Sequence, residues 1–363
     1  MIPLIYETTS RILSLNSMHY LGRLTGCTEC TVKESRNADY TLSASVVKNS
    51  ECANSVVIQN YICAKPNPTD EPQFFEIYEV VEKNNIISIK AKHIKHNCYN
   101  NVLNAGYAEA QLYTPQEAYE EIDPIFENNY VFSSDFTNRK NIKLGFTQVC
   151  TLGDFLGGAE GSLLDLFHGE YKWNNFNVSF LKSRGKKRAY RLKWGDNISN
   201  YEKTQSSETT ISHVCAYATV YDEFSKQDIQ IIANPYEIFE QKSKTNKLSV
   251  YPVPDKLVDG ITVNSSTGEG YEFVKNTCRI AVQNAYMSAN NLGEITTNIK
   301  VDIPSILDGM QQLNLCDTIK VILNDDGTEA ESKIVKTTYD TLKERYKQLE
   351  LGSFKTKLSD FVK

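Results

Sequence analysis

Long apolar runs are missing from this sequence of 363 residues. No stretch of about 18 apolar residues exists that could cross a bilayer as a helix. The first residues, Met-Ile-Pro-Leu-Ile-Tyr-Glu, include neither a basic segment nor a long apolar one, so we expect no signal peptide. The sequence therefore predicts a protein that is made in a cytoplasm, has no stable membrane anchor, and leaves its cell inside an assembly or by lysis.

An excess of positive charge is also missing. Lysine and arginine total 39 residues and aspartate and glutamate total 45, which gives a net charge of −6. A protein that binds nucleic acid through its phosphates needs a basic surface. We therefore expect no general phosphate-binding surface and no sequence-specific binding of nucleic acid.

Motifs of common enzyme sites are not present either. His168-Gly-Glu170 is not the His-Glu-x-x-His of zinc peptidases, and no Gly-x-Ser-x-Gly turn exists. The glycines of Gly157–Gly161 lack the lysine of a phosphate-binding loop, which favours a flexible loop. Asn324–Gly327 is shorter than a calcium loop and lacks its distal glutamate. We therefore predict no catalytic residue, no cofactor and no metal.

The cysteines and histidines form no convincing metal site. Nine cysteines are scattered from Cys27 to Cys316, and this odd number predicts reduced, mostly buried thiols. Cys27–Cys30 is a single CxxC without the second pair that a zinc site wants. His93-x-x-His96-x-Cys98 is more tempting, but residues three apart on a strand face opposite sides. A structural role is favoured for both groups.

The composition favours strands. Twenty-one Tyr and fifteen Phe stand against four Met, which is untypical of a helical bundle. Alternating apolar and polar residues predict a β domain, a sheet or small barrel, over 1–99. We expect an α+β domain over 100–205, a β/α domain over 206–297, part of which is a candidate to complete the first domain, and a C-terminal β domain over 298–363. Thr114–Glu117 predicts a capped helix start with proline at its first position.

The stretch from Gly157 to Ile198 is the most informative. Ser162 can cap a short helix, with Gly169 as its left-handed exit. Alternating apolar residues then predict three strands, with Asn174-Asn175 as a turn and both tryptophans in one aromatic core. The alternating residues are Tyr171, Trp173, Phe176, Val178, Phe180, Tyr190, Leu192 and Trp194. The basic run Arg184–Arg188 predicts a solvated hairpin tip, with contact to an acidic partner surface as the alternative.

The end of the sequence is ambiguous between helix and strand. Tyr339, Leu342, Tyr346 and Leu349 recur at spacings of three and four, which favours a helix. The segments 333–339 and 346–351 also fit two strands around a charged turn. Periodicity alone leaves both open.

Several motifs resemble one known family. Gly-Ser-Leu-Leu-Asp165-x-x-x-Gly-Glu-Tyr-x-Trp-Asn-Asn175, followed by Arg-Gly185 and Trp194-Gly-x-Asn-Ile198, is similar to the signature of the siphophage tail-associated protein family. This family is also known as the prophage endopeptidase tail family or phage minor structural protein N-terminal region. Trp194 stands where the family usually has Tyr, and Asp196 where it often has Lys. Further segments match in order, namely Glu34–Leu42, Gln73–Val80, Ala91–Ile94, Leu315–Val321, Tyr339–Arg345 and Leu349–Gly352.

The resemblance implies a fold and a set of partners. The fold is a phage baseplate hub, mainly β with α+β insertions, with two tube-like β-barrel domains and strands rather than a helix at 333–352. The function is a structural hub at the virion tail tip that closes the tail tube for host attachment and DNA delivery. Its implied partners are two further copies in a homotrimer, the distal tail protein, the tape measure protein and a host-binding tip or receptor-binding protein. Synthesis would take place in the bacterial host cytoplasm.

Two other functions compete with the hub. One is a tail endopeptidase that degrades the cell wall, and the other is a carbohydrate-binding tail adhesin. In the resembling family the lytic parts follow the matched region, whereas this sequence ends at Lys363, soon after the match. We therefore expect a protein that is not an enzyme.

Overall fold

The structure is a computed structural model of the chain. It describes residues 1–352 except 9, 11–13, 101, 104–109, 124–128, 145–149, 160, 207–212, 234–235, 238–247, 254, 288–295, 303–312 and 323–328. Contacts divide the described residues into two units: residues 1–203 with 298–352, and residues 204–297. The finer division at 1–99, 100–205, 206–297 and 298–363 stays a prediction.

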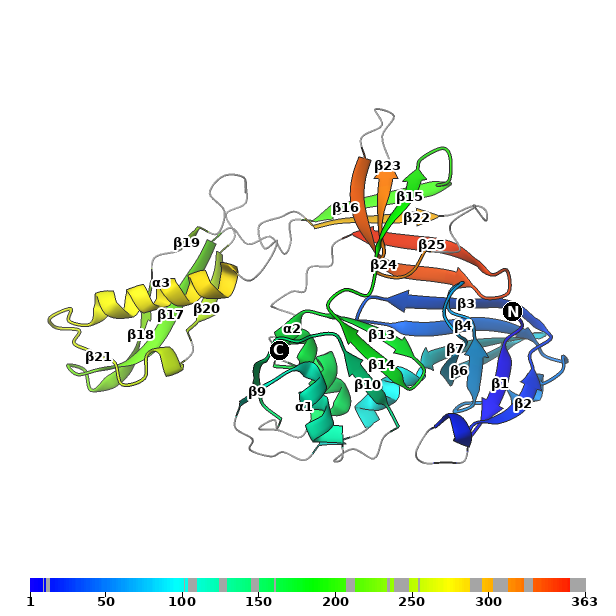
Figure 1. The fold of residues 1–363 in the computed structure, drawn as a ribbon, viewed down its shortest axis with the longest axis horizontal. Helices are drawn as coiled ribbons and strands as arrows, with labels where there is room; N and C mark the ends of the chain where they lie inside the picture. The colour runs from blue at the N-terminus through cyan, green and yellow to red at the C-terminus, as the bar shows by residue number, and fades with distance from the viewer. Residues whose placement is uncertain are drawn as a thin grey trace. The chain divides into compact units, whose positions relative to one another are not determined.

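A 13-stranded sheet runs through the first unit. Its main path is β16-β22-β25-β24-β3-β4-β7-β6-β5-β1-β2, with β15 and β23 attached through β24 (Figure 1). The N-terminal strands are β1 (Leu4–Glu7), β2 (His19–Arg23), β3 (Cys27–Ser35), β4 (Tyr40–Val47), β5 (Tyr61–Ala64), β6 (Gln73–Lys83) and β7 (Ile86–His93). The others are β15 (Lys187–Lys193), β16 (Asn200–Ser206), β22 (Thr296–Asp302), β23 (Thr318–Ile322), β24 (Glu329–Asp340) and β25 (Arg345–Gly352).

The two ends of the chain share this sheet. β24 pairs antiparallel with β3, from Lys336 opposite Ser35 to Asp340 opposite Thr31. The strands that the resemblance implied for 333–352 are confirmed. The helix favoured by the spacing does not form, because β24 pairs with β25 on one side and with β3 on the other. The fold is mainly β with α+β insertions, as predicted. Among the described strands the path runs from β16 to β2 without closing on itself.

A small α+β module is inserted between β7 and β15. Its sheet has the order β10-β14-β13, from β10 (Val131–Ser134), β13 (Glu170–Asn174) and β14 (Asn177–Leu181). Its helices are α1 (Pro115–Ile122), the π-helical turn η5 (Asp154–Gly158) and α2 (Leu163–Phe167). Two short pairs, β8 (Val102–Leu103) with β12 (Cys150–Thr151) and β9 (Gln111–Tyr113) with β11 (Lys140–Ile142), complete it. The 3-10 turns of the unit are η1 (Leu15–Ser17), η2 (Ala53–Ser55) and η3 (Ile94–Asn100).

The predicted caps and turn of the module are present. Thr114 and Glu117 form the capping box of α1, and the Ser162 hydroxyl accepts a hydrogen bond from the Asp165 N–H. Asn175 has a φ of 52° at the tip of the β13–β14 turn. Tyr171 stacks on Phe180 with ring centres 4.5 Å apart, inside an aromatic core.

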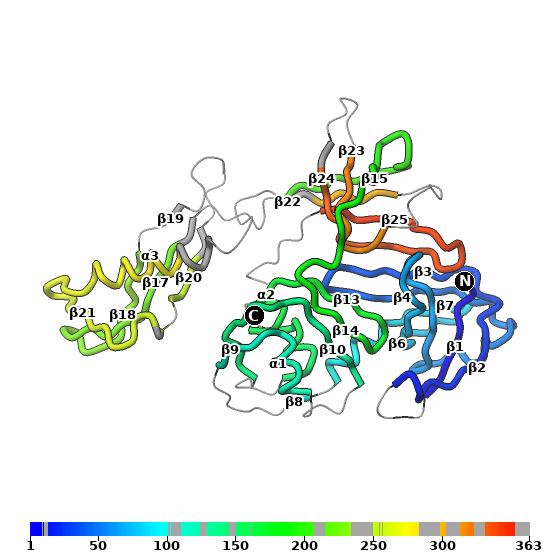
Figure 2. Tube along the Cα trace, viewed as in Figure 1, coloured from blue at the N-terminus to red at the C-terminus, as the bar shows by residue number. Residues whose placement is uncertain are grey.

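The third strand predicted for this module is wrong. Figure 2 shows the chain passing from β14 into β15, which lies beside β23 rather than beside β14. Trp194, at the end of β15, is 41% exposed and contacts Tyr201. The aromatic core therefore holds one tryptophan, Trp173, because β15 finds its hydrogen-bonding partner in the C-terminal part of the chain.

The second unit is a small sheet covered by one helix. Its strands are β17 (His213–Asp222), β18 (Gln227–Ile232), β19 (Tyr236–Glu237), β20 (Leu248–Pro252) and β21 (Thr262–Val263), all paired to β17. The helix α3 (Tyr271–Met287) follows the turn η6 (Asp255–Leu257). Its apolar face, Val274, Cys278, Ala281 and Val282, packs with Ala216, Ala218, Val220 and Ile231. In neither unit is a described helix long and apolar enough to cross a membrane.

The exit of α2 differs from the prediction. His168, and not Gly169, has the left-handed conformation, with a φ of 54°. Gly169 is needed for space, because a Cβ there would lie 2.6 Å from the Phe180 ring and 2.8 Å from Phe136.

Two substitutions separate these roles. We expect Gly169→Ala to lower the free energy of unfolding by about 1 to 3 kcal/mol, because the added carbon overpacks two rings. His168→Gly should stay within about 1 kcal/mol of the parent, because it relieves left-handed strain and adds freedom to the unfolded chain. Urea unfolding followed by tryptophan fluorescence measures both, since both tryptophans belong to the first unit. Equal effects of the two substitutions would contradict this assignment.

Candidate functional site

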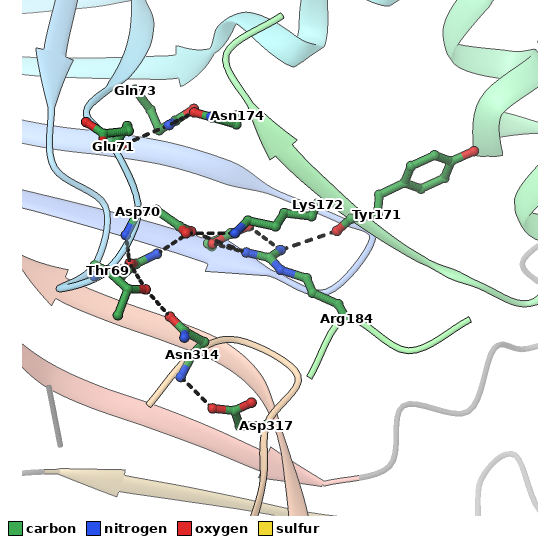
Figure 3. Close-up of polar contacts among 12 residues, drawn as sticks. Thr69, Asp70, Glu71, Gln73, Tyr171, Lys172, Asn174, Arg184, Asn314 and Asp317 are labelled. Atoms are coloured by element: carbon green, nitrogen blue, oxygen red, sulfur yellow. Dashed lines mark hydrogen bonds and ion pairs between the residues drawn. The ribbon is translucent and has the colours of Figure 1, made fainter. Parts of the chain in front are cut away.

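Buried polar side chains gather in the first unit where four segments meet. The segments are β3, the loop of residues 65–72 between β5 and β6, the chain from β13 to Arg184, and residues 313–317 before β23 (Figure 3). We call this cluster the polar junction. Its central residues are Glu34, Asp70, Gln73, Arg184 and Asp317.

Arg184 forms a two-pronged ion pair with Glu34. Nη1 lies 2.6 Å from Oε1 and Nη2 lies 3.2 Å from Oε2, and each side chain is 6% exposed. Nη1 also donates to the Tyr171 carbonyl oxygen at 3.3 Å. Burial by itself would lower the pKa of Arg184, but the charge of Glu34 and its hydrogen bonds outweigh burial and raise that pKa. The pair thus fastens β3 to the segment that follows β14.

Asp70 ties the loop after β5 to the module. The Asn67 amide oxygen accepts from the N–H groups of Thr69 at 2.9 Å and Asp70 at 2.7 Å, which closes a turn among three prolines. The Asp70 carboxylate accepts from Asn67 Nδ2 and pairs with Lys172 at 2.9 Å. Burial by itself would raise the pKa of Asp70. The hydrogen bonds from Asn67 and Lys172 lower it by more, so this pKa lies below its usual range. The Thr69 hydroxyl lies 2.6 Å from Asn314 Oδ1 and links the loop to the C-terminal strands.

Asp317 anchors the basic run before β15. Its carboxylate accepts from the Lys186 N–H at 2.7 Å and from Arg188 Nε at 2.8 Å. Gly185 lies so close to the chain that a Cβ there would stand 1.9 Å from the Cys316 carbonyl oxygen. The solvated hairpin tip predicted for Arg184–Arg188 is therefore wrong for the two arginines, because two buried carboxylates hold them against the body of the unit. Lys186 and Lys187 between them are exposed, as predicted.

Glu170 connects the module to β24. Its carboxylate lies 2.6 Å from Lys333 Nζ and 3.3 Å from Arg36 Nη1, and it accepts from the Arg184 N–H at 2.8 Å. Burial raises the pKa of Glu170, but the hydrogen bonds from Lys333 and from the Arg184 backbone lower it below its usual range. Residues from three distant parts of the sequence thus share one carboxylate.

Gln73 satisfies the turn of the module. Its Nε2 donates to Asn174 Oδ1 and to the Glu71 carbonyl, each at 2.8 Å, and its Oε1 accepts from the Asn175 N–H at 2.6 Å. His93 completes the group. Its Nδ1 accepts from the Lys95 N–H at 3.0 Å, so Nε2 carries the proton and donates to Gln73 Oε1 at 3.1 Å.

His93 is a buried, neutral histidine with a structural role. It is fully buried, and its ring stacks on Tyr40 with ring centres 4.3 Å apart. Burial, and then the charges of Lys95 and His96, hold the pKa of His93 well below its ordinary value. His93 therefore stays neutral and, through its hydrogen bond to Gln73, connects β7 to the residues that hold the turn of the module.

The other sequence candidates lie apart from the junction. Cys27 and Cys30 are free thiols on β3, and within the described ranges no group of three or more potential metal ligands occurs. His96 and Cys98 belong to the 3-10 turn η3, so the strand-face argument does not reach them. His168 is exposed at the end of α2. Asn324–Gly327 falls outside the described residues.

The contacts of the junction fit a structural role, in which its side chains hold distant segments together. Glu34, Asp70, Glu170 and Asp317 each have a cationic partner. Glu34 accepts two hydrogen bonds from the one guanidinium group, and the other three also bind backbone or amide donors. Sequence reasoning missed it, although one sign was visible. Glu34 continues the buried alternation of Cys30 and Val32, and a charge in that phase needs a partner from elsewhere.

Removal of the arginine should be strongly destabilising. We expect Arg184→Met to lower the free energy of unfolding by about 3 to 5 kcal/mol, because Glu34 is left buried without its partner. The double variant Glu34→Gln with Arg184→Met should lose less than the sum of the single variants. Urea unfolding followed by tryptophan fluorescence measures all three.

An exposed ion pair provides the matched control. Lys187 and Glu331 lie 2.6 Å apart, but their side chains are 68% and 47% exposed. Lys187→Met should change the free energy of unfolding by less than about 1 kcal/mol. If Arg184→Met were as mild as Lys187→Met, the junction would not be a stabilising centre.

Acid should weaken the first unit through His93. Because its folded-state pKa is depressed, the unfolded chain binds a proton below about pH 6.5 that the folded chain does not. The free energy of unfolding should therefore decrease as the pH is lowered, and this histidine contributes up to about 1.4 kcal/mol per pH unit to the decrease. Urea unfolding between about pH 8 and pH 5 measures the slope, which His93→Gln should reduce. An unchanged slope in the His93→Gln variant would contradict this role of His93.

Comparison with known proteins gives similarity in structure but not in sequence. No protein-family model matches the chain, and no curated protein matches it. The prophage tail protein gp18 of Listeria monocytogenes EGD-e has a similar structure, with a TM-score of 0.59 at 12% identity, covering 99% of this chain and 97% of that one.

Two further structures are similar over the whole length. The tail protein of Neisseria meningitidis MC58 gives a TM-score of 0.57 at 10% identity, covering 99% of both chains. The 43 kDa tail protein of prophage MuSo2 from Shewanella oneidensis gives 0.55 at 9% identity, covering 98% of both chains. At these identities the likeness concerns the fold alone, and the chain has the fold of these tail proteins.

Proposed function

We propose that this chain is a structural hub of a phage or prophage tail. In this proposal it belongs to the siphophage tail-associated family that its motifs resemble, and it sits at the virion tail tip after synthesis in the bacterial host cytoplasm. There it closes the tail tube and docks the distal tail protein and the tape measure protein. A host-binding tip or receptor-binding protein would attach to it.

The observation that carries the proposal is the likeness along the entire chain. Three tail proteins share the fold over 97% or more of their own lengths. The polar junction supports the same role, because its ion pairs and hydrogen bonds fasten the N-terminal strands, the module and the C-terminal strands into one unit. A part that must carry load in an assembly benefits from such fixed geometry.

The proposal includes a homotrimer and no enzymatic activity. Closed rotational symmetry would let three copies surround a channel, and the mildly acidic net charge of −6 would let DNA pass without adhering. The cell-wall endopeptidase remains the competing function from the enzyme class, and the carbohydrate-binding adhesin the competing function from the binding class.

The oligomeric state tests the hub. Light scattering after size exclusion should give three times the 41.1 kDa of one chain. A monomer that also stays monomeric when it is mixed with the distal tail protein would contradict the proposal. A cleared zone in a peptidoglycan gel loaded with the purified chain would favour the endopeptidase instead.

A further inference from the structure

A cavity lies in the first unit beside the polar junction. It has a volume of about 240 Å³ and is lined by residues from the β3–β4 turn, η3, η5, α2 and β13. At about 30 Å³ for each water molecule, it could hold about eight waters. The pocket opens to solvent, because its lining residues Asp39 and Tyr99 are exposed, so a small molecule can enter it from outside.

One wall of the cavity is charged and polar. Lys95 donates to the Ala38 carbonyl oxygen, and burial lowers the pKa of Lys95 to about 8, so its ammonium group is mostly charged at neutral pH. Asp39 adds a carboxylate of opposite sign. The Nε2 atom of His96 is buried, and no hydrogen-bond partner for it exists among the described residues.

The polar wall excludes some ligands. Asn37 also lines the cavity, but its amide already donates to the Gly169 carbonyl at 2.9 Å and accepts from the Tyr171 N–H at 2.8 Å. Asp39 and Lys95 together make a site with no net charge, which selects against a lone anion or cation. A purely apolar ligand would displace water from the exposed Asp39 carboxylate without replacing the hydrogen bonds of that water.

The other wall is aromatic. Trp173 and Tyr99 line it, and Trp173 is buried while Tyr99 is half exposed. Gly153 lets the Tyr99 ring in, because a Cβ at that position would lie 2.4 Å from the ring. The Tyr171 hydroxyl donates to the Leu156 carbonyl oxygen at 2.7 Å, so this wall presents mainly aromatic ring surface to a ligand.

We propose that this cavity binds a single sugar ring. Hydroxyl groups of the sugar would donate to the Asp39 carboxylate and accept from the Lys95 ammonium group, and the apolar C–H face would pack on Trp173 and Tyr99. A pyranose occupies about as much space as six waters, which fits the volume. The proposal concerns a site within one chain and stands apart from the hub function.

The two tryptophans provide the probe. Trp194 directly follows β15 and does not line the cavity, so Trp194→Phe leaves Trp173 as the sole tryptophan, which excitation at the red edge of the absorption band selects over the tyrosines. Titration of this variant with glucose, galactose, mannose or N-acetylglucosamine should change the Trp173 emission saturably, with a midpoint of about 1 to 10 mM for at least one sugar.

Variants test the assignment of roles. In the same background, Asp39→Asn should weaken binding about tenfold or more, because a hydrogen bond to a charged acceptor is lost. Asp228→Asn, an exposed position in the second unit, is the matched control and should bind as the parent does. Asp39 is itself exposed, so its replacement should leave the fold intact.

Three outcomes would overturn the proposal. They are no saturable change with any of the four sugars, equal binding by the Asp39→Asn variant, and a response to inorganic phosphate without a response to sugar. None of them bears on the trimer, whose mass is measured separately.

Discussion

The ion pair between Arg184 and Glu34 is the contact on which the first unit depends. It joins residues 150 positions apart, and both side chains are almost without access to water. Such a pair is stabilising only when every remaining polar atom around it is satisfied. Asp70 and the Tyr171 carbonyl oxygen supply that second layer on Arg184. The loop after β5 and the strand β13 therefore form part of the surroundings that make the buried pair stabilising.

Local features of the fold could be predicted from the sequence. The capped starts of α1 and α2 and the turn at Asn175 follow from residues within a few positions of one another. Features set by distant segments could not. The departure of β15 from the module depends on β23, and the burial of Arg184 depends on Glu34. Charge alone favoured a solvated run, because the buried acceptors lie far away in the sequence.

Strand β13 links the junction to the cavity. Its alternation sends Lys172 toward Asp70, while Tyr171 and Trp173 line the cavity on the other side. A change in the position of β13 would thus affect both the junction and the cavity.

The pairing of β24 with β3 has a consequence for synthesis. β3 is complete once Ser35 has left the ribosome, but its partner on one side ends at Asp340. At about 5 to 20 residues per second, that edge would stay open for about 15 to 60 s. Unpaired strand edges attract other strands. We therefore expect a truncated product that lacks β24 to be prone to aggregate through this edge of β3.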